Sequence, residues 1–87
     1  MGRPRNLEHV REIAERVRAG ETYQTIGEEL GLSTQVVGKR VKTIRELVTE
    51  ATGDSWLKAR PVAVCREFLR LVDAGDIELG GSSTSTS

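Results

Sequence analysis

The feature that most constrains this chain is a link of only three residues, 31–33, between two segments with helical patterns of apolar residues. Thr22 and Ser33 precede the two segments and belong to the residue types that cap helix N-termini. Gly31 suits the left-handed conformation in which many helices end, and Gly27 is small enough to allow close helix packing. Because so short a link leaves little freedom, the sequence predicts two helices that cross steeply.

Helical periodicity also extends to both sides of this pair. Apolar residues recur at helical spacing over residues 7–19, with Asn6 as the expected cap and Gly20 as the expected stop. The segment after the link is predicted to be helical over residues 34–52, ending at Gly53. At 1.5 Å per residue this helix is about 28 Å long, which is more than a DNA groove requires.

A fourth helix is expected over residues 61–74, because Pro61 is tolerated in a first helical turn and Gly75 follows as a stop. Apolar residues spread round most of this helix and leave a narrow polar face. A helix of this kind needs more than one apolar neighbour, so we expect it to form a contact between two copies of the chain. The residues assigned to that dimer contact are Val64, Phe68, Leu69, Leu71 and Val72.

Length and local composition predict one domain with short tails. A chain of 87 residues has room for a single, modest core. Residues 1–6 carry two arginines and no apolar periodicity, which indicates a flexible basic arm before a folded domain at residues 7–79. Within that domain, residues 76–79 are expected to be a short strand or an extended end. Residues 80–87 form a Gly/Ser/Thr tail that is expected to be disordered.

Charge and single residues exclude several function classes. The chain has 13 basic and 13 acidic side chains, but the basic ones concentrate in the arm and over residues 39–45. Cys65 and His9 are the single cysteine and histidine, so we expect no metal site, no cofactor and no internal disulfide. No apolar run is long enough to cross a bilayer, which predicts a cytoplasmic protein. No paired-carboxylate, nucleophile–base or phosphate-loop arrangement is present, so we expect no enzyme.

The outward positions of residues 34–52 carry the side chains predicted to contact DNA. An amide such as that of Gln35 reads an adenine edge, and a lysine reaches guanine or phosphate. A glycine at position 38 lowers helix stability by about 1 kcal/mol relative to alanine. Gly38 either has no function that offsets this cost, or permits a close approach of DNA. Residues assigned to the major groove are Ser33, Thr34, Gln35, Gly38, Lys39 and Lys42, and those assigned to the DNA backbone are Thr22, Tyr23, Arg40 and Thr43.

Residues 2–44 resemble the helix-turn-helix of LuxR-type regulators and of the DNA-binding domains of serine invertases and resolvases. The segment Gly2-Arg3-Pro4-Arg5 is similar to the basic arm that precedes the three helices in the invertases. By this resemblance, Arg3 and Arg5 enter an A·T-rich minor groove, with Gly2 and Pro4 alongside them.

The resemblance implies a three-helix helix-turn-helix core. Together with the helical periodicity described above, it predicts an all-α chain with this core, a long recognition helix at residues 34–52 and an additional C-terminal helix. The catalytic domain of a recombinase is absent from this sequence. The likeness therefore implies regulation or architectural DNA binding and not recombination.

These features predict a sequence-specific DNA-binding protein: a small prokaryotic or phage transcriptional regulator, or one carried on a mobile element. Because a neutral chain offers few cations to phosphates, a homodimer on an inverted repeat would double the contacts. One alternative is a small terminase-type subunit for viral DNA packaging, which would form a closed ring of many subunits. The other is a protein-interaction adaptor whose third or fourth helix docks on a partner protein.

Overall fold

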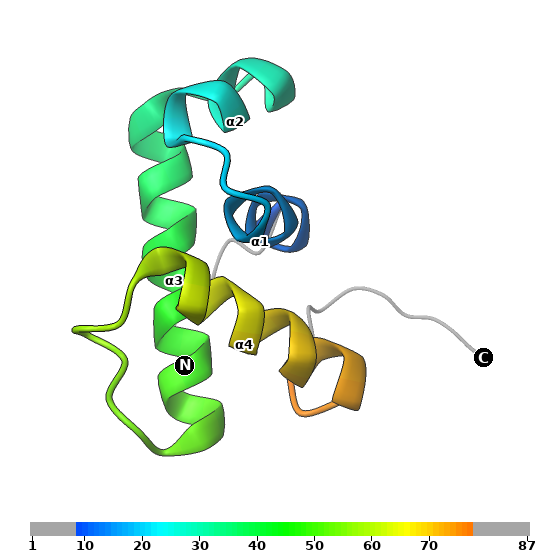
Figure 1. Cartoon of the computed structure of the whole chain (residues 1–87), viewed down its shortest axis with the longest axis vertical. Helices are drawn as coiled ribbons and strands as arrows, with labels where there is room; N and C mark the ends of the chain where they lie inside the picture. The colour runs from blue at the N-terminus through cyan, green and yellow to red at the C-terminus, as the bar shows by residue number, and fades with distance from the viewer. Residues whose placement is uncertain (1–8, 78–87) are drawn as a thin grey trace, which may run out of the picture.

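A computed structural model of the chain describes residues 9–77, and within this range it contains four α-helices and no strand (Figure 1). The prediction of an all-α chain is confirmed for these residues, as are the predicted bounds of the last three helices. The helices are α1 (Val10–Arg18), α2 (Tyr23–Leu30), α3 (Thr34–Thr52) and α4 (Pro61–Ala74).

Side-chain caps and a glycine set the bounds of α2 and the start of α3. The hydroxyl oxygen of Thr22 accepts a hydrogen bond from the backbone N–H of Thr25 at 3.2 Å. The hydroxyl oxygen of Ser33 accepts one from the N–H of Val36, also at 3.2 Å. Each bond satisfies a donor that has no partner within its own helix. Gly31 ends α2 with a φ of 72°, so the two helices are joined by three residues, as predicted.

The first helix begins later than the sequence predicts. His9 has a φ of 66° and a ψ of 2°, which is the left-handed region, so regular helix begins at Val10 and not at residue 7. His9 therefore precedes α1, and its Nδ1 atom lies 3.4 Å from a carboxylate oxygen of Glu12. Asn6, the expected cap, lies outside the described residues.

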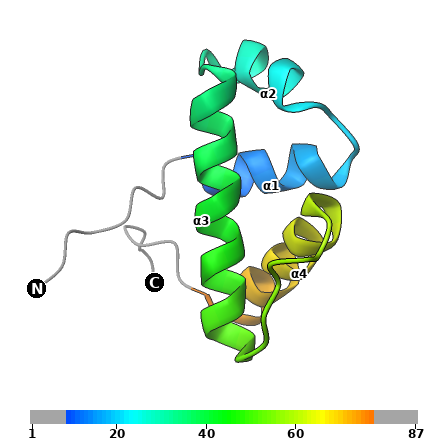
Figure 2. The same cartoon turned by 90° about the vertical axis from the view of Figure 1, so that its left-hand side faces the viewer.

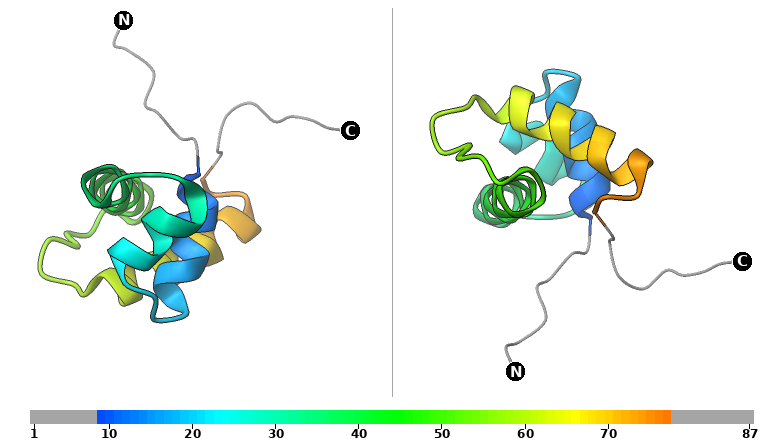
Figure 3. Two further views of the ribbon diagram at one scale, coloured as in Figure 1. Left: turned by 90° about the horizontal axis from the view of Figure 1, so that it is seen from above. Right: turned by 90° about the horizontal axis from the view of Figure 1, so that it is seen from below.

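The helix α3 forms a column against which the other three helices pack. In Figure 2, α2, α1 and α4 lie along this column in that order, from its N-terminal end to its C-terminal end. The helix α4 contacts both α1 and α3, whereas α2 contacts α1 and α3 but not α4. Seen along its axis, α3 stands at one edge of the helical body, with α1, α2 and α4 on one side of it (Figure 3). The side of α3 that faces away from them is uncovered along its N-terminal half.

Buried side chains from all four helices form one apolar core. On α3 they are spaced three and four residues apart, which is the pattern of a helix with one buried side. Phe68 of α4 is the largest fully buried side chain, and burial of such a side chain contributes about 1.5–3 kcal/mol to folding. The core residues are Val10, Ile13, Ala14, Val17, Ile26, Val37, Val41, Ile44, Val48, Val64, Cys65, Phe68, Leu69, Leu71 and Ile77.

The residues of α4 that the sequence assigns to a dimer contact pack against the core of their own chain. Val64, Phe68, Leu69 and Leu71 are at most 5% exposed within a single chain, and Val72 is partly buried against the same core. Because α4 packs on two helices at once, its excess of apolar residues is satisfied inside the chain. Periodicity shows that a helix needs two apolar neighbours, but not whether those neighbours belong to the same copy.

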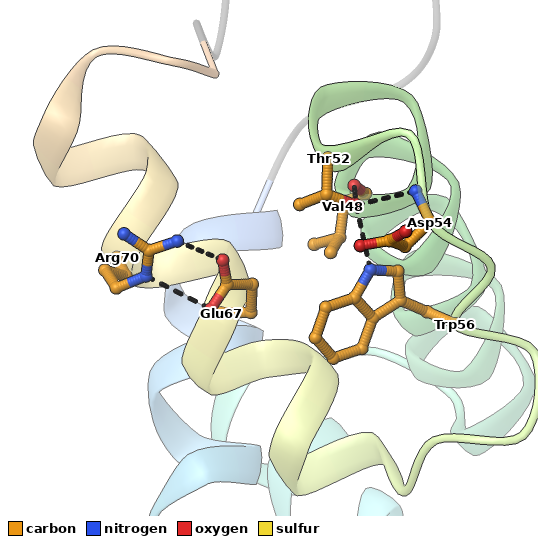
Figure 4. A network of polar contacts seen from close by, with 6 residues as sticks. All are labelled: Val48, Thr52, Asp54, Trp56, Glu67 and Arg70. Carbon is orange, nitrogen blue, oxygen red and sulfur yellow. Dashed lines mark hydrogen bonds and ion pairs between the residues drawn. The ribbon is translucent and has the colours of Figure 1, made fainter.

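A hydrogen-bonded corner joins α3 to α4 over residues 53–60 (Figure 4). The indole N–H of Trp56 donates to the hydroxyl oxygen of Thr52 at 3.0 Å, and this hydroxyl donates to the carbonyl of Val48 at 2.8 Å. The backbone N–H of Asp54 donates to the same hydroxyl oxygen at 3.2 Å. Thr52 therefore fastens the corner to the last turn of α3.

Several predicted parts of the chain lie outside the described residues, namely the arm at 1–6, residues 78–79 and the tail at 80–87. Asp76 and Ile77, which are described, do not form a strand. Their backbone N–H groups donate to the carbonyl of Leu71, and Ile77 is buried against the core. Among the described residues, no helix is long and apolar enough to cross a membrane.

Candidate nucleic-acid interface

The uncovered side of α3 carries the residues that the sequence assigns to the major groove. At about 100° per residue, the positions from Thr34 to Lys42 in this set fall within an arc of about 140° that excludes the buried stripe, with Lys39 roughly opposite the stripe and Thr34 next to it. All of them lie in the N-terminal half of α3 or at its cap. The exposed residues of this set are Ser33, Thr34, Gln35, Lys39 and Lys42, and Gly38 is half-buried.

Gly38 lies in the middle of this face with open space in front of its backbone. A Cβ atom at this position would meet no heavy atom within 4 Å, so crowding inside the chain does not require glycine. The backbone conformation does not require it either, since Gly38 is not among the residues with positive φ. A glycine in a helix interior nevertheless lowers stability by about 1 kcal/mol relative to alanine. The effect of Gly38 is to leave a strip of helix backbone accessible between polar side chains.

Gly27, by contrast, is required by packing inside the chain. A Cβ atom there would lie 2.5 Å from the backbone oxygen of Leu32. The backbone N–H of Leu32 also donates to the carbonyl of Gly27 at 2.7 Å. Because the position of a Cβ is set by its own backbone and the oxygen of Leu32 is a main-chain atom, no side-chain rotation can relieve this contact. The close approach at Gly27 is therefore to the three-residue link before α3, whereas the sequence predicted an approach to the third helix itself.

The cationic groups on this face are not neutralised by carboxylates. Neither Lys39 nor Lys42 forms an ion pair within residues 9–77, whereas cations elsewhere do. Arg70 of α4 donates to the carboxylate of Glu67, for example, and this bond lowers the pKa of Glu67 (Figure 4). Both lysines therefore remain available for an anionic partner.

Charge changes sign along the outer face of α3. Lys39 and Lys42 lie in its N-terminal half, and Glu46 and Glu50 follow on the same side toward the C-terminus. Phosphates are attracted to the first pair and repelled by the second. The surface that suits a nucleic acid is thus confined to about the first three turns of the helix.

The residues assigned to the DNA backbone do not form one surface. Thr22 is exposed, and Tyr23 lines a pocket together with Lys42, so these two residues lie beside the outer face of α3. Burial raises the pKa of the Tyr23 hydroxyl, which therefore stays protonated and can donate a hydrogen bond. Arg40 lies about 160° round the helix from Lys42 and is therefore on another side of α3. Its side chain is half-buried and already interacts within the chain. Thr43 is half-buried and donates to the carbonyl of Lys39 at 3.2 Å.

Sequence reasoning missed the pocket beside this face. It has a volume of about 570 Å³ and lies between α3, the start of α2 and the corner at residues 53–60. Its walls include Arg45 of α3 and Leu57 of the corner, and Leu57 is 76% exposed. These residues are far apart in the sequence and meet only because the helices cross. Leu57, a large apolar residue outside the periodic helical segments, is the one signal that could have indicated the pocket.

No protein family model, curated protein or solved structure matches this chain, so the chemistry of the site rests on its own residues. Gly2, Arg3, Pro4 and Arg5, the residues assigned to the minor groove, lie outside the described part of the chain. Within residues 9–77, no group of three or more His, Cys, Asp and Glu side chains is placed to hold a metal ion.

Proposed function

We propose that this protein binds double-stranded DNA in a sequence-specific manner, with the N-terminal half of α3 in the major groove. The observation that carries this proposal is the uncovered face of α3, where Gln35, Lys39 and Lys42 surround an open strip of backbone at Gly38. Amide and ammonium groups of this kind form hydrogen bonds to base edges and phosphates. In this proposal α1, α2 and α3 act as a helix-turn-helix core, as in the regulators and invertases that the sequence resembles.

The geometry of the turn supports this proposal. The contact between Gly27 and Leu32 holds α2 and α3 in a fixed arrangement, so the cationic end of α3 projects beside α2 without a flexible joint. Thr22 and Tyr23 at the start of α2 flank that end and are suited to a neighbouring phosphate. The basic segment at residues 2–5 adds two arginines for a minor groove.

The charge balance supports two copies on one DNA site. Phosphate contacts supply a large share of DNA affinity, and one neutral chain presents only a few cations. Two copies on an inverted repeat, about one helical turn of DNA apart, would double that number. We propose a regulator of this kind, of phage or mobile-element type, whose dimer contact lies outside the core-facing residues of α4.

Selection from a randomised DNA pool tests sequence-specific binding directly. We expect one enriched motif, and Gln35→Ala should lower discrimination at one position by about 1–3 kcal/mol while leaving binding to unrelated DNA almost unchanged. Lys39→Ala and Lys42→Ala should weaken binding to all sequences and each reduce the salt slope by about 1. Arg66→Ala, which removes an exposed cation from α4, is the matched control and should have no comparable effect. A pool with no enriched sequence at low salt would contradict the proposal.

The mass of the complex tests the number of copies. On the selected DNA we expect two chains per duplex, measured by light scattering or native mass spectrometry. A single chain per duplex would contradict the dimer without affecting the major-groove assignment. A closed ring of many chains would instead favour the DNA-packaging alternative.

A further inference from the structure

The pocket between α3 and the corner has an apolar interior. Val41, Leu57 and Pro61 line it together with the ring of Tyr23, and its volume of about 570 Å³ is within the range of sites for small organic molecules. Leu57 is 76% exposed, whereas Trp56 and Ala59 of the same corner pack against the core. A molecule in the pocket would therefore remove apolar surface from water.

The walls of this pocket are fixed before any ligand arrives. The corner is held by the hydrogen bond from the Trp56 indole to Thr52 at 3.0 Å. A second bond runs from a terminal nitrogen of Arg45 to the carbonyl of Ala59, also at 3.0 Å. These bonds attach both ends of the corner to α3. A ligand would consequently lose little affinity to reordering of the protein.

Arg45 brings a positive charge to the pocket that is not held in an ion pair within the described part of the chain. Its guanidinium is half-buried and forms no ion pair within the described residues. Its Nε atom is fully buried without a hydrogen-bond partner. A cation that has lost part of its hydration and has no carboxylate partner binds an incoming anion more strongly than a solvated one. Lys42 lines the same pocket and adds a second cation.

We propose that this pocket binds a small carboxylate with an apolar body, such as an aromatic acid. The carboxylate would bind at Arg45 and Lys42, and the apolar body would cover Val41, Leu57 and Pro61. Glu46 and Glu50 also line the pocket. They repel the carboxylate of the ligand, as they repel a phosphate, but both are exposed, so water and salt weaken this repulsion. The repulsion directs the negative end of the ligand away from them and toward Arg45.

The position of the pocket gives such a ligand an effect on DNA binding, a consequence that depends on the proposed function above. Gly38 and Lys42 belong both to the pocket and to the face of α3 proposed to enter the major groove. A ligand and DNA cannot occupy these residues at the same time, so the binding of one excludes the other. The small carboxylate would thus act as an effector that releases the protein from its DNA.

A titration of the full chain with naphthoate, without DNA, tests the pocket by itself. We expect saturable shifts of the backbone amide signals of Gly38, Thr49 and Leu57, with a dissociation constant of about 1 mM or less for a probe of this size. Naphthalenemethanol, which has the ring without the charge, and acetate, which has the charge without the ring, should each bind at least about tenfold more weakly. Equal binding of naphthalenemethanol would overturn the role of Arg45.

Two variants separate the pocket from general effects on folding. Arg45→Met should weaken naphthoate binding about tenfold or more, as should Leu57→Ser, which alters an exposed side chain and leaves the core intact. Arg66→Ala is the matched control with an unchanged affinity. Shifts scattered over the surface, or an affinity unchanged in Leu57→Ser, would overturn the proposal.

Competition with the selected DNA duplex then tests the consequence. Saturating naphthoate should weaken the DNA complex at least about fivefold in the unaltered protein and leave it unchanged in Leu57→Ser. Binding of naphthoate in a protein that binds no DNA would refute the proposed function and leave the pocket in place. DNA binding without any naphthoate binding would refute the ligand pocket and leave the proposed function in place.

Discussion

The two halves of α3 differ in what covers them, although they belong to one continuous helix of 19 residues. In the N-terminal half, the outer side carries Lys39 and Lys42 around the open space at Gly38. In the C-terminal half, α4 packs on the inner side, the corner at residues 53–60 lies alongside, and the charge of the outer side becomes negative.

This difference shows how a small chain supports an exposed face that packing inside the chain does not use. The C-terminal half and α4 supply much of the apolar burial, which allows the N-terminal half to carry a glycine and unpaired cations that contribute nothing to folding. A single helix can therefore present one end to a partner because its other end is anchored. The following changes test each side of this comparison.

Phe68→Ala should have the largest effect on stability, because it leaves a cavity where α4 meets the rest of the core. The expected loss is about 3–5 kcal/mol, which approaches the whole stability of a domain of this size. Urea unfolding followed by circular dichroism measures it. Leu57→Ala, at an exposed position, should change stability by less than about 0.5 kcal/mol. A loss below about 1 kcal/mol for Phe68→Ala would contradict the anchoring role of α4.

Gly27→Ala should destabilise the opposite end of the molecule. The new Cβ atom would be forced against the backbone oxygen of Leu32, and relief requires the turn to move away from α2. Overpacking of this kind costs about 1–3 kcal/mol. The free energy of unfolding in urea measures the loss, and amide exchange should show it concentrated in residues 22–36. An unchanged stability would mean that the turn is more adaptable than its geometry indicates.

Gly38→Ala should change stability in the opposite direction. The added methyl group meets nothing within 4 Å, and alanine favours the helix, so we expect a gain of about 1 kcal/mol. The same variant should bind the selected DNA more weakly, because the methyl group occupies the open strip on the proposed recognition face. Equal or tighter DNA binding by this variant would show that Gly38 has no role in the contact.

Thr52→Val should have a smaller effect that is confined to the corner. It removes the acceptor for the Trp56 indole and leaves the helix and its core-facing residues in place. We expect the free energy of unfolding to fall by about 1 kcal/mol and the fluorescence of Trp56 to change. Thr52→Ser keeps the hydroxyl group and should leave both the stability and the fluorescence unchanged. DNA affinity should be unaffected, since Thr52 lies in the last turn of α3, away from Lys39 and Lys42. A loss of DNA binding in Thr52→Val alone would mean that the corner takes part in the contact.

Cys65 offers a test that requires no substitution. Its thiol is fully buried, and burial raises its pKa to about 12, so almost no thiolate exists at pH 8 in the folded chain. We expect negligible alkylation of the native protein and rapid alkylation in denaturant. Rapid modification under native conditions would show that α4 opens readily, contrary to its anchoring role.

Local sequence signals predicted α2, α3 and α4 because each is bounded by a residue with a specific backbone role. Thr22, Ser33 and the glycines at 31, 53 and 75 act through bonds or φ values within a few positions. The start of α1 could not be predicted in this way. His9 adopts a left-handed φ that neither its residue type nor the apolar spacing around it indicates.

Local sequence signals could not predict which helices pack against one another. The apolar residues of α4 were assigned to a second copy because periodicity does not reveal which helix covers them. The exposed positions of α3 followed directly from its 3.6-residue period, so the candidate face was predictable. The pocket was not, because Tyr23, Arg45 and Leu57 come together only through the crossing of α2 and α3 and the path of the corner.

The most direct test of the central claim is a backbone amide NMR titration of the full chain with the DNA duplex selected from the random pool. If the N-terminal half of α3 enters the major groove, the largest shifts will be at residues 33–42, with smaller shifts at the start of α2. Signals from residues 46–60 and from α4 should stay almost unchanged. Shifts centred on α4 or on the corner, or no shifts at low salt, would contradict the account.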